Sequence, residues 1–132
     1  MSVETFEYSG THFATVIRAN YHSDGIQFFT PSDYSQQLGY MNRPAGYRIG
    51  AHKHKDTQRN VSKTQEVLFV KSGKILVSFY GDDRRECGST IIETGDVLLL
   101  ANGGHGFRMI TDSEIIEVKQ GPYVGEEDKV RF

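Results

Sequence analysis

The stretch EVLFVKSGKILVSFYGDDRRECGSTIIETGDVLLLANGGHGFRMITDSEIIEVK, residues 66–119, decides the fold that we expect for this chain. Within it, short runs rich in β-branched and aromatic residues alternate with clusters of glycine and aspartate, which suit tight turns. The turn signals are KSGK at 71–74, YGDDRRE at 80–86, ETGD at 93–96 and ITDSE at 110–114. Runs separated by such short turns are typical of consecutive antiparallel hairpins.

Four earlier runs have the same character: HFATVIRA at 12–19, IQFFT at 26–30, LGYMN at 38–42 and YRIGAHKH at 47–54. The best helix candidate, PSDYSQQL at 31–38, is too short to form a layer. The 132 residues therefore predict a single all-β domain, a β-sandwich or barrel. We expect both ends, residues 1–12 and 125–132, to be loosely held or to pack on a partner subunit.

Composition excludes several classes of protein. Hydrophobic residues make up 37% and charged residues 24%, and no apolar run approaches the roughly 20 residues that span a bilayer. The N-terminus MSVETFEYSG does not resemble a secretory signal, so a cytoplasmic location is expected. The net charge is −2 with scattered basic residues, which argues against nucleic acid as a partner. The single cysteine, Cys87, has no partner for an internal disulfide.

Two histidines lie one residue apart in the run at 47–54. Because side chains alternate between the faces of a strand, His52 and His54 are expected on one face together with Arg48. Glu66 opens the next apolar run, and His105 lies in a glycine-rich turn before another. These four residues, His52, His54, Glu66 and His105, would be costly to bury without a ligand, so a shared binding point is the hypothesis. His12 and His22 have no neighbouring ligand types and are interpreted as surface or hydrogen-bonded histidines.

Histidine nitrogens and a carboxylate suit one divalent transition metal, Fe, Mn, Ni, Co or Zn. Three histidines and one carboxylate leave an octahedral ion two open positions for water, oxygen or substrate. Surface histidines, a solvated Glu66 and a turn histidine at 105 are the alternative interpretations of the same residues. The pattern of residues alone does not choose between them.

The spacing of these residues resembles the first motif of the cupin family. Gly46 is followed after five intervening residues by His52, then by His54, and Glu66 is followed after six intervening residues by Gly73. Eleven residues separate His54 from Glu66 where the family usually has three or four, so this intervening stretch is expected to loop out.

The stretch GDVLLLANGGHGF is similar to the second cupin motif, so the resemblance extends from about residue 46 to residue 119. Gly95 opens it and His105 ends it, with Ala101 in the usual place of a proline and Met109 in that of an asparagine. The resemblance implies a small double-stranded β-helix, that is, a jelly-roll barrel of two antiparallel sheets. It also implies that His52, His54, Glu66 and His105 bind a metal inside it. The barrel core is expected at about 40–120, with the N-terminal strands and the C-terminal tail packed outside.

The function that the resemblance implies is that of a metal-dependent enzyme of isomerase, epimerase or oxygenase type, acting on a small polar substrate. TQEVLFVKSGK and IIEVKQGPY are similar to small cupins of bacterial cell-surface polysaccharide biosynthesis, which suggests a sugar-derived substrate. Two alternatives stay open: a metal-free deoxysugar isomerase-like enzyme with histidine acid/base groups, and a non-catalytic small-molecule binder. Arg48 and Tyr123 are the candidate substrate-binding residues, no catalytic residue is assigned, and a homodimer is expected.

Overall fold

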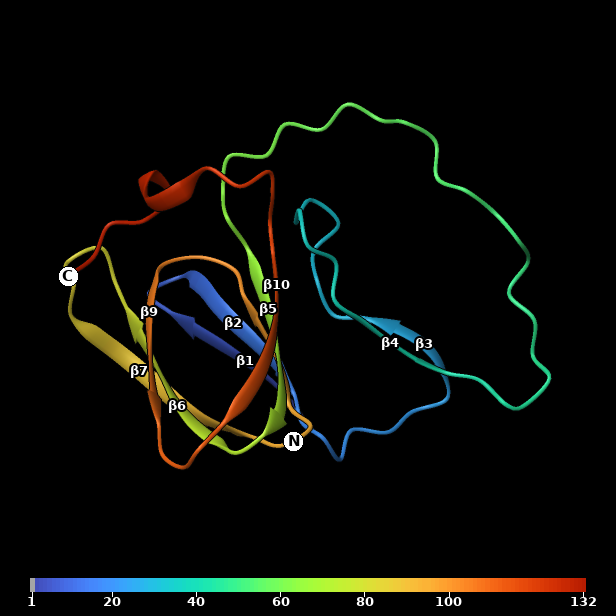
Figure 1. Ribbon diagram of the computed structural model, residues 1–132, viewed down its shortest axis with the longest axis horizontal. Helices are drawn as coiled ribbons and strands as arrows, with labels where there is room; N and C mark the ends of the chain where they lie inside the picture. Colours follow the sequence, from blue (N-terminus) through green and yellow to red (C-terminus); the bar gives the residue numbers. More distant parts are fainter. Residues whose placement is uncertain (1) are drawn as a thin grey trace.

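The computed structural model describes residues 2–132 and shows an all-β fold with antiparallel strand pairs (Figure 1). Strands of the large sheet follow the order β1 (Val3–Tyr8), β2 (Thr11–Ile17), β8 (Val97–Leu100), β5 (Glu66–Ser72) and β10 (Glu114–Lys119). In the small sheet the order is β7 (Glu86–Glu93), β6 (Lys74–Tyr80) and β9 (Gly104–Met109). A separate hairpin pairs β3 (Gly25–Phe28) with β4 (Gly39–Asn42), and a 3-10 helix covers Gly125–Asp128. The prediction of an all-β antiparallel fold is confirmed.

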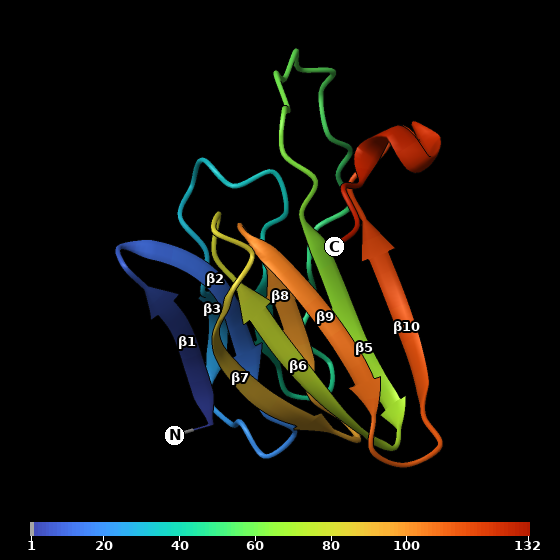
Figure 2. The same ribbon diagram turned by 90° about the vertical axis from the view of Figure 1, so that its left-hand side faces the viewer.

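The two sheets pack face to face as an open sandwich, and Figure 2 shows the small sheet crossing in front of the large one. Neither sheet closes on itself, because β10 ends the large sheet and β9 ends the small sheet. Of the consecutive hairpins predicted within residues 66–119, only β6–β7 forms, because the other turns join strands of different sheets. Gly73 makes the β5–β6 turn with a φ of 107°. A side chain there would meet the backbone oxygen of Asp112 at 2.5 Å, so only glycine fits.

The core fills the space between the sheets. Alternate residues of β5 and β6 point inward, so Leu68 and Val70 face Val77 and Phe79 across the sandwich, and all four are buried. The Phe79 ring lies 5.9 Å from that of Phe13 and 5.5 Å from that of Phe6.

The N-terminal strands belong to this core, which corrects the expectation that they pack outside it. β2 lies between β1 and β8, with Ala14 paired to Leu100 and Val16 to Leu98. β1 itself was not expected, although residues 3–8 mix acidic and aromatic residues in the alternating pattern of a half-buried edge strand.

A second, smaller cluster covers the outer face of the large sheet. Leu38 packs with Ile17 and Leu99 there, and Tyr21, Phe29 and Tyr34 pack against them. The segment between β2 and β4 is therefore fixed on the outside of the sandwich, and it leads into the β3–β4 hairpin. The stretch 31–38, the best helix candidate in the sequence, forms turns and no helix.

The run at 47–54 is not a strand, and the prediction of one was wrong. Residues 43–63 have no regular secondary structure and are exposed throughout. Figure 1 shows the segment between β4 and β5 sweeping away from the sandwich beyond the β3–β4 hairpin. The sequence has the alternation of a strand, but a strand also needs a partner edge, and this segment has none within residues 2–132.

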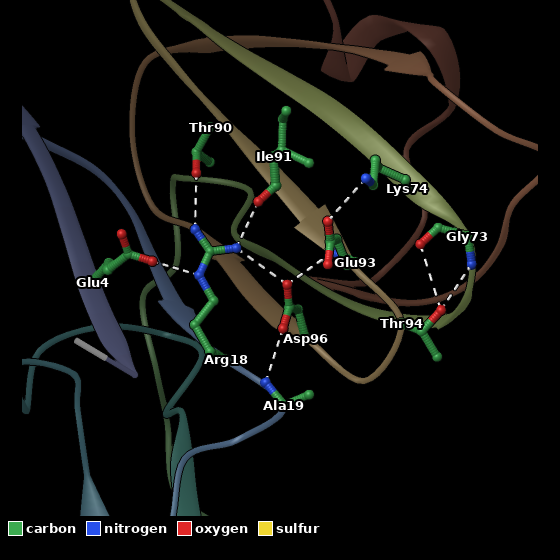
Figure 3. Close-up of polar contacts among 10 residues, drawn as sticks. All are labelled: Glu4, Arg18, Ala19, Gly73, Lys74, Thr90, Ile91, Glu93, Thr94 and Asp96. Carbon is green, nitrogen blue, oxygen red and sulfur yellow. Dashed lines mark hydrogen bonds and ion pairs between the residues drawn. The ribbon is translucent and has the colours of Figure 1, made fainter.

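One polar network ties the two sheets together at the end of β2 (Figure 3). The Arg18 guanidinium bonds to Glu4 of β1, to the Thr90 hydroxyl and Ile91 carbonyl oxygens of β7, and to Asp96. This contact set spans both sheets and the β7–β8 turn. Among residues 2–132, no helix has the length and apolar character needed to cross a membrane.

Candidate functional site

Glu66 and His105 come from different sheets and meet at one end of the sandwich. Glu66 opens β5 on its inner face and is 7% exposed, while the His105 side chain on β9 is 30% exposed. The His105 Nε2 atom lies 3.8 Å from the Glu66 Oε2 atom. Two of the four predicted metal ligands are thus adjacent.

Two residues of β10 complete this polar cluster. The antiparallel register places Lys119 opposite Glu66 and Glu117 opposite Leu68, so both share the inner face. The Lys119 Nζ atom lies 3.6 Å from a carboxylate oxygen of each glutamate. We call Glu66, Glu117, Lys119 and His105 the inner polar cluster.

Burial and neighbouring charge shift the protonation of the cluster. Burial raises the pKa of Glu66, and the adjacent Glu117 carboxylate raises it further. Burial lowers the pKa of His105 below its usual range, whereas the Glu66 carboxylate raises that of Lys119. The site therefore favours the neutral forms of Glu66 and His105, and a neutral imidazole is the form that binds a metal.

Glu66 and His105 line an open cavity of about 1860 Å³. This exceeds the 300–1,000 Å³ that is usual for small-molecule sites, because the sandwich is open at this end. Asn102, Tyr34 and His12 also line it. The cavity has room for more than a small ligand.

His12 is hydrogen-bonded as predicted, although it faces this cavity. Its Nε2 atom lies 3.0 Å from the Ala14 carbonyl oxygen, which only accepts, so Nε2 carries the proton. The Nδ1 atom therefore accepts from the Tyr34 hydroxyl at 2.6 Å. Both ring nitrogens are satisfied, which leaves His12 a lining residue rather than a ligand.

His52 and His54 lie on the exposed 43–63 segment, with ring centroids 5.5 Å apart. The His52 Nδ1 donates to the Gly50 carbonyl oxygen at 2.7 Å, which leaves Nε2 free to bind a metal. Among residues 2–132, no three His, Cys, Asp or Glu side chains gather in a way that would hold a metal ion. One chain thus presents the four predicted ligands as two separate pairs.

The predicted substrate-binding residues do not lie at the inner polar cluster. Arg48 is exposed on the 43–63 segment, and Tyr123 is 90% exposed beside a shallow hollow of about 240 Å³. Neither lines the large cavity. Glu117 of the cluster pairs with Lys119.

Sequence reasoning missed Lys119 and Glu117 as site residues. The alternation in EIIEVK places Glu117 and Lys119 on one face, and this signal was available. What the sequence lacked was the register that pairs β10 with β5.

No protein-family model, curated protein or solved structure matches this chain. The resemblance to cupins therefore depends on the motif residues themselves, and the function is argued from the site.

Proposed function

We propose that this chain is a cupin-type protein that binds one divalent transition metal with Glu66 and His105, completed by His52 and His54, and acts on a small polar substrate. The observation that supports the proposal is the convergence of Glu66 and His105 from two sheets in one cavity. The Glu66 carboxyl group, which would lose its proton on binding an ion, and the neutral His105 imidazole are a donor pair for Fe, Mn, Ni, Co or Zn. Two donors alone would bind such an ion weakly, so the histidines of the 43–63 segment are needed.

A bound ion of this kind would polarise a carbonyl or hydroxyl oxygen of the substrate. Around it, Lys119 offers a cation and Glu117 an acceptor for substrate hydroxyl groups. The cavity is lined by hydroxyl, amide and carboxylate groups as well as aromatic rings, which suits a polyhydroxylated molecule such as a sugar derivative. Oxygenase chemistry would need Fe(II), whereas isomerisation or epimerisation would use the ion to polarise a carbonyl group.

Elemental analysis of protein purified without an affinity tag tests the proposal, with the parent compared to Glu66→Gln and His52→Ala. We expect near-stoichiometric metal in the parent and its loss in both variants. His22→Ala, an exposed histidine far from the motif in sequence, is the matched control and should keep the metal. Metal-free parent protein after incubation with each of the five ions would reject the proposal.

A second candidate function is acid/base catalysis without a metal. The 3.8 Å contact between Glu66 and His105, with both pKa values shifted toward the neutral forms, favours it, because such a pair can exchange a proton with a substrate. Turnover that persists in a strong chelator, and that His105→Gln abolishes, would support this function over the first.

A further inference from the structure

The two separated ligand pairs raise the question of what brings them together. The arm, residues 43–63, carries His52 and His54, and the cavity carries Glu66 and His105. A loop of this length without its own secondary structure is uncommon in a compact domain and usually has a function. Among residues 2–132, the one hydrogen bond between the arm and the rest of the chain joins Lys63 to Asn102, at the arm's C-terminal root.

The arm has the features of a strand that pairs elsewhere. Tyr47 and Ile49 alternate with Arg48, Gly50 and His52, and both apolar side chains are exposed. An exposed backbone with this alternation is suited to pairing with a free sheet edge.

Such an edge exists beside His105. β9 pairs with β6 on one side only, and β10 pairs with β5 on one side only. We call the unpaired sides of β9 and β10 the open edge. Apolar side chains are exposed along it: Phe107, Met109, Ile116 and Val118. Natural proteins rarely leave such an edge uncovered, because it pairs with other chains.

The net charge of the arm is opposite in sign to that of the rest of the chain. The arm contains six lysines and arginines and one aspartate, so its net charge is +5. Since the whole chain carries −2, the remainder carries −7. Two of the carboxylates of that remainder, Glu66 and Glu117, lie in the inner polar cluster. The arm is therefore attracted to the acidic remainder of a second copy as a whole, while Lys119 offsets one of the two carboxylates in the cluster itself.

The root of the arm directs it outward from its own sandwich. Leu38 is packed on the outer face of the large sheet, and the Gln65 side chain accepts from the Gln36 backbone nitrogen at 3.1 Å. Both ends of the segment that includes the arm are thus anchored, and Figure 1 shows the arm itself extending past the hairpin. The hairpin also exposes Ile26, Phe28 and Met41, so the whole extension presents apolar surface to another molecule.

We infer that two copies of this chain exchange arms, so that His52 and His54 of one copy complete the site formed by Glu66 and His105 of the other. The arm adds to the open edge of the second copy, and a twofold axis makes the exchange reciprocal, with two composite sites per dimer. This inference rests on the proposed metal site and goes beyond it, because it names the partner and the residues that the partner supplies.

A mixed dimer tests the exchange. The arm variant carries His52→Ala and His54→Ala, and the cavity variant carries Glu66→Gln and His105→Ala. Each carries a different histidine-free peptide tag, the two are co-expressed, and mixed dimers are isolated by both tags in series. Co²⁺ is the probe, measured by elemental analysis after equilibrium dialysis.

We expect about one Co²⁺ per chain in the parent, none in either variant alone, and about one per two chains in the mixed dimer. In an exchanged mixed dimer, the intact arm reaches the intact cavity of the other chain. If each arm served its own chain, both sites of the mixed dimer would be defective and no Co²⁺ would bind, which would overturn the exchange while the parent still bound metal. A parent that binds no Co²⁺ would instead reject the proposed function.

Light scattering gives a readout that does not depend on metal. The parent and a variant lacking residues 45–62 are compared, with far-UV circular dichroism to confirm that the shortened chain keeps its strands. We expect a dimer for the parent and a monomer for the shortened chain. A monomeric parent, or a dimer that survives removal of the arm, would overturn the inference.

Discussion

Asp96 offers the sharpest test of how the two sheets are held together. Its carboxylate accepts from the backbone nitrogens of Ala19 and Glu93, each at 2.8 Å, and from the Arg18 guanidinium at 3.1 Å (Figure 3). The Asp96 side chain is buried, so replacement by alanine leaves two backbone donors without their acceptor and removes one of the two carboxylates that pair with Arg18. An unsatisfied buried donor costs about 1–3 kcal/mol, so with the weakened ion pair we expect a loss of about 3–5 kcal/mol. That is a large share of the 5–15 kcal/mol that typically stabilises a domain.

Asp96→Asn separates charge from hydrogen bonding. The amide keeps one acceptor oxygen but points an N–H group at a donor, so we expect a loss of about 1.5–3 kcal/mol, below that of Asp96→Ala. Asp82, exposed in the β6–β7 turn, is the matched control, and Asp82→Ala should lie within about 0.5 kcal/mol of the parent. Urea unfolding followed by circular dichroism measures all three. A loss below about 1 kcal/mol for Asp96→Ala, with an unchanged m-value, would refute this account of the network.

Further changes test the cavity, the core, the turn and the open edge. Burial raises the folded-state pKa of Glu66, so the folded metal-free protein binds more protons than the unfolded chain, and its stability falls as pH rises from the unfolded value toward the folded one. Glu66→Gln should remove this fall and leave the metal-free protein at least as stable as the parent at pH 7, measured by urea unfolding; a lower stability at pH 7 with the fall retained would contradict it. Phe79→Ala in the core should cost about 3–5 kcal/mol, and a loss under 1 kcal/mol would show that the core refills the cavity. Gly73→Ala should cost more than about 1 kcal/mol because of its positive φ and the close Asp112 oxygen, and an unchanged unfolding midpoint would show that the turn relaxes. Met109→Lys on β9 should halve the molar mass seen by light scattering, while the control Ile91→Lys, on β7, should not; equal effects would contradict a role for the open edge.

The sequence predicted the strands where apolar alternation and turn residues agree. From β5 to β10 four of the five turns have their own signal, so local information located the strands. It did not show that only β6 and β7 would pair as consecutive strands, because the other turns cross between the sheets. It failed for the run at 47–54, because alternation shows that a segment suits a strand and does not show which edge it pairs with. It also missed β1, whose pairing with β2 depends on burial of Phe6 against Phe79, a contact distant in sequence.

The candidate site, like the fold, was predictable only where a local sequence pattern fixes the position of a residue. Glu66 was placed correctly on the inner face with Leu68, because strand alternation fixes a face. The contribution of Lys119 required the register between β5 and β10, which no local pattern contains. The separation of His52 from Glu66 required the path of the whole 43–63 segment.

The central place of β2 in the large sheet sets the order of events during synthesis. Ala14 pairs with Leu100, so β1 and β2 leave the ribosome well before β8, the next strand of their sheet. Translation adds about 5–20 residues per second, and during that delay the apolar face of the β1–β2 hairpin has no sheet to cover it. Because this apolar face is exposed, we expect the nascent chain to bind chaperones. We also expect its folding yield to depend more on translation speed between residues 18 and 100 than elsewhere. Pairing so distant in sequence also makes the final closure slow.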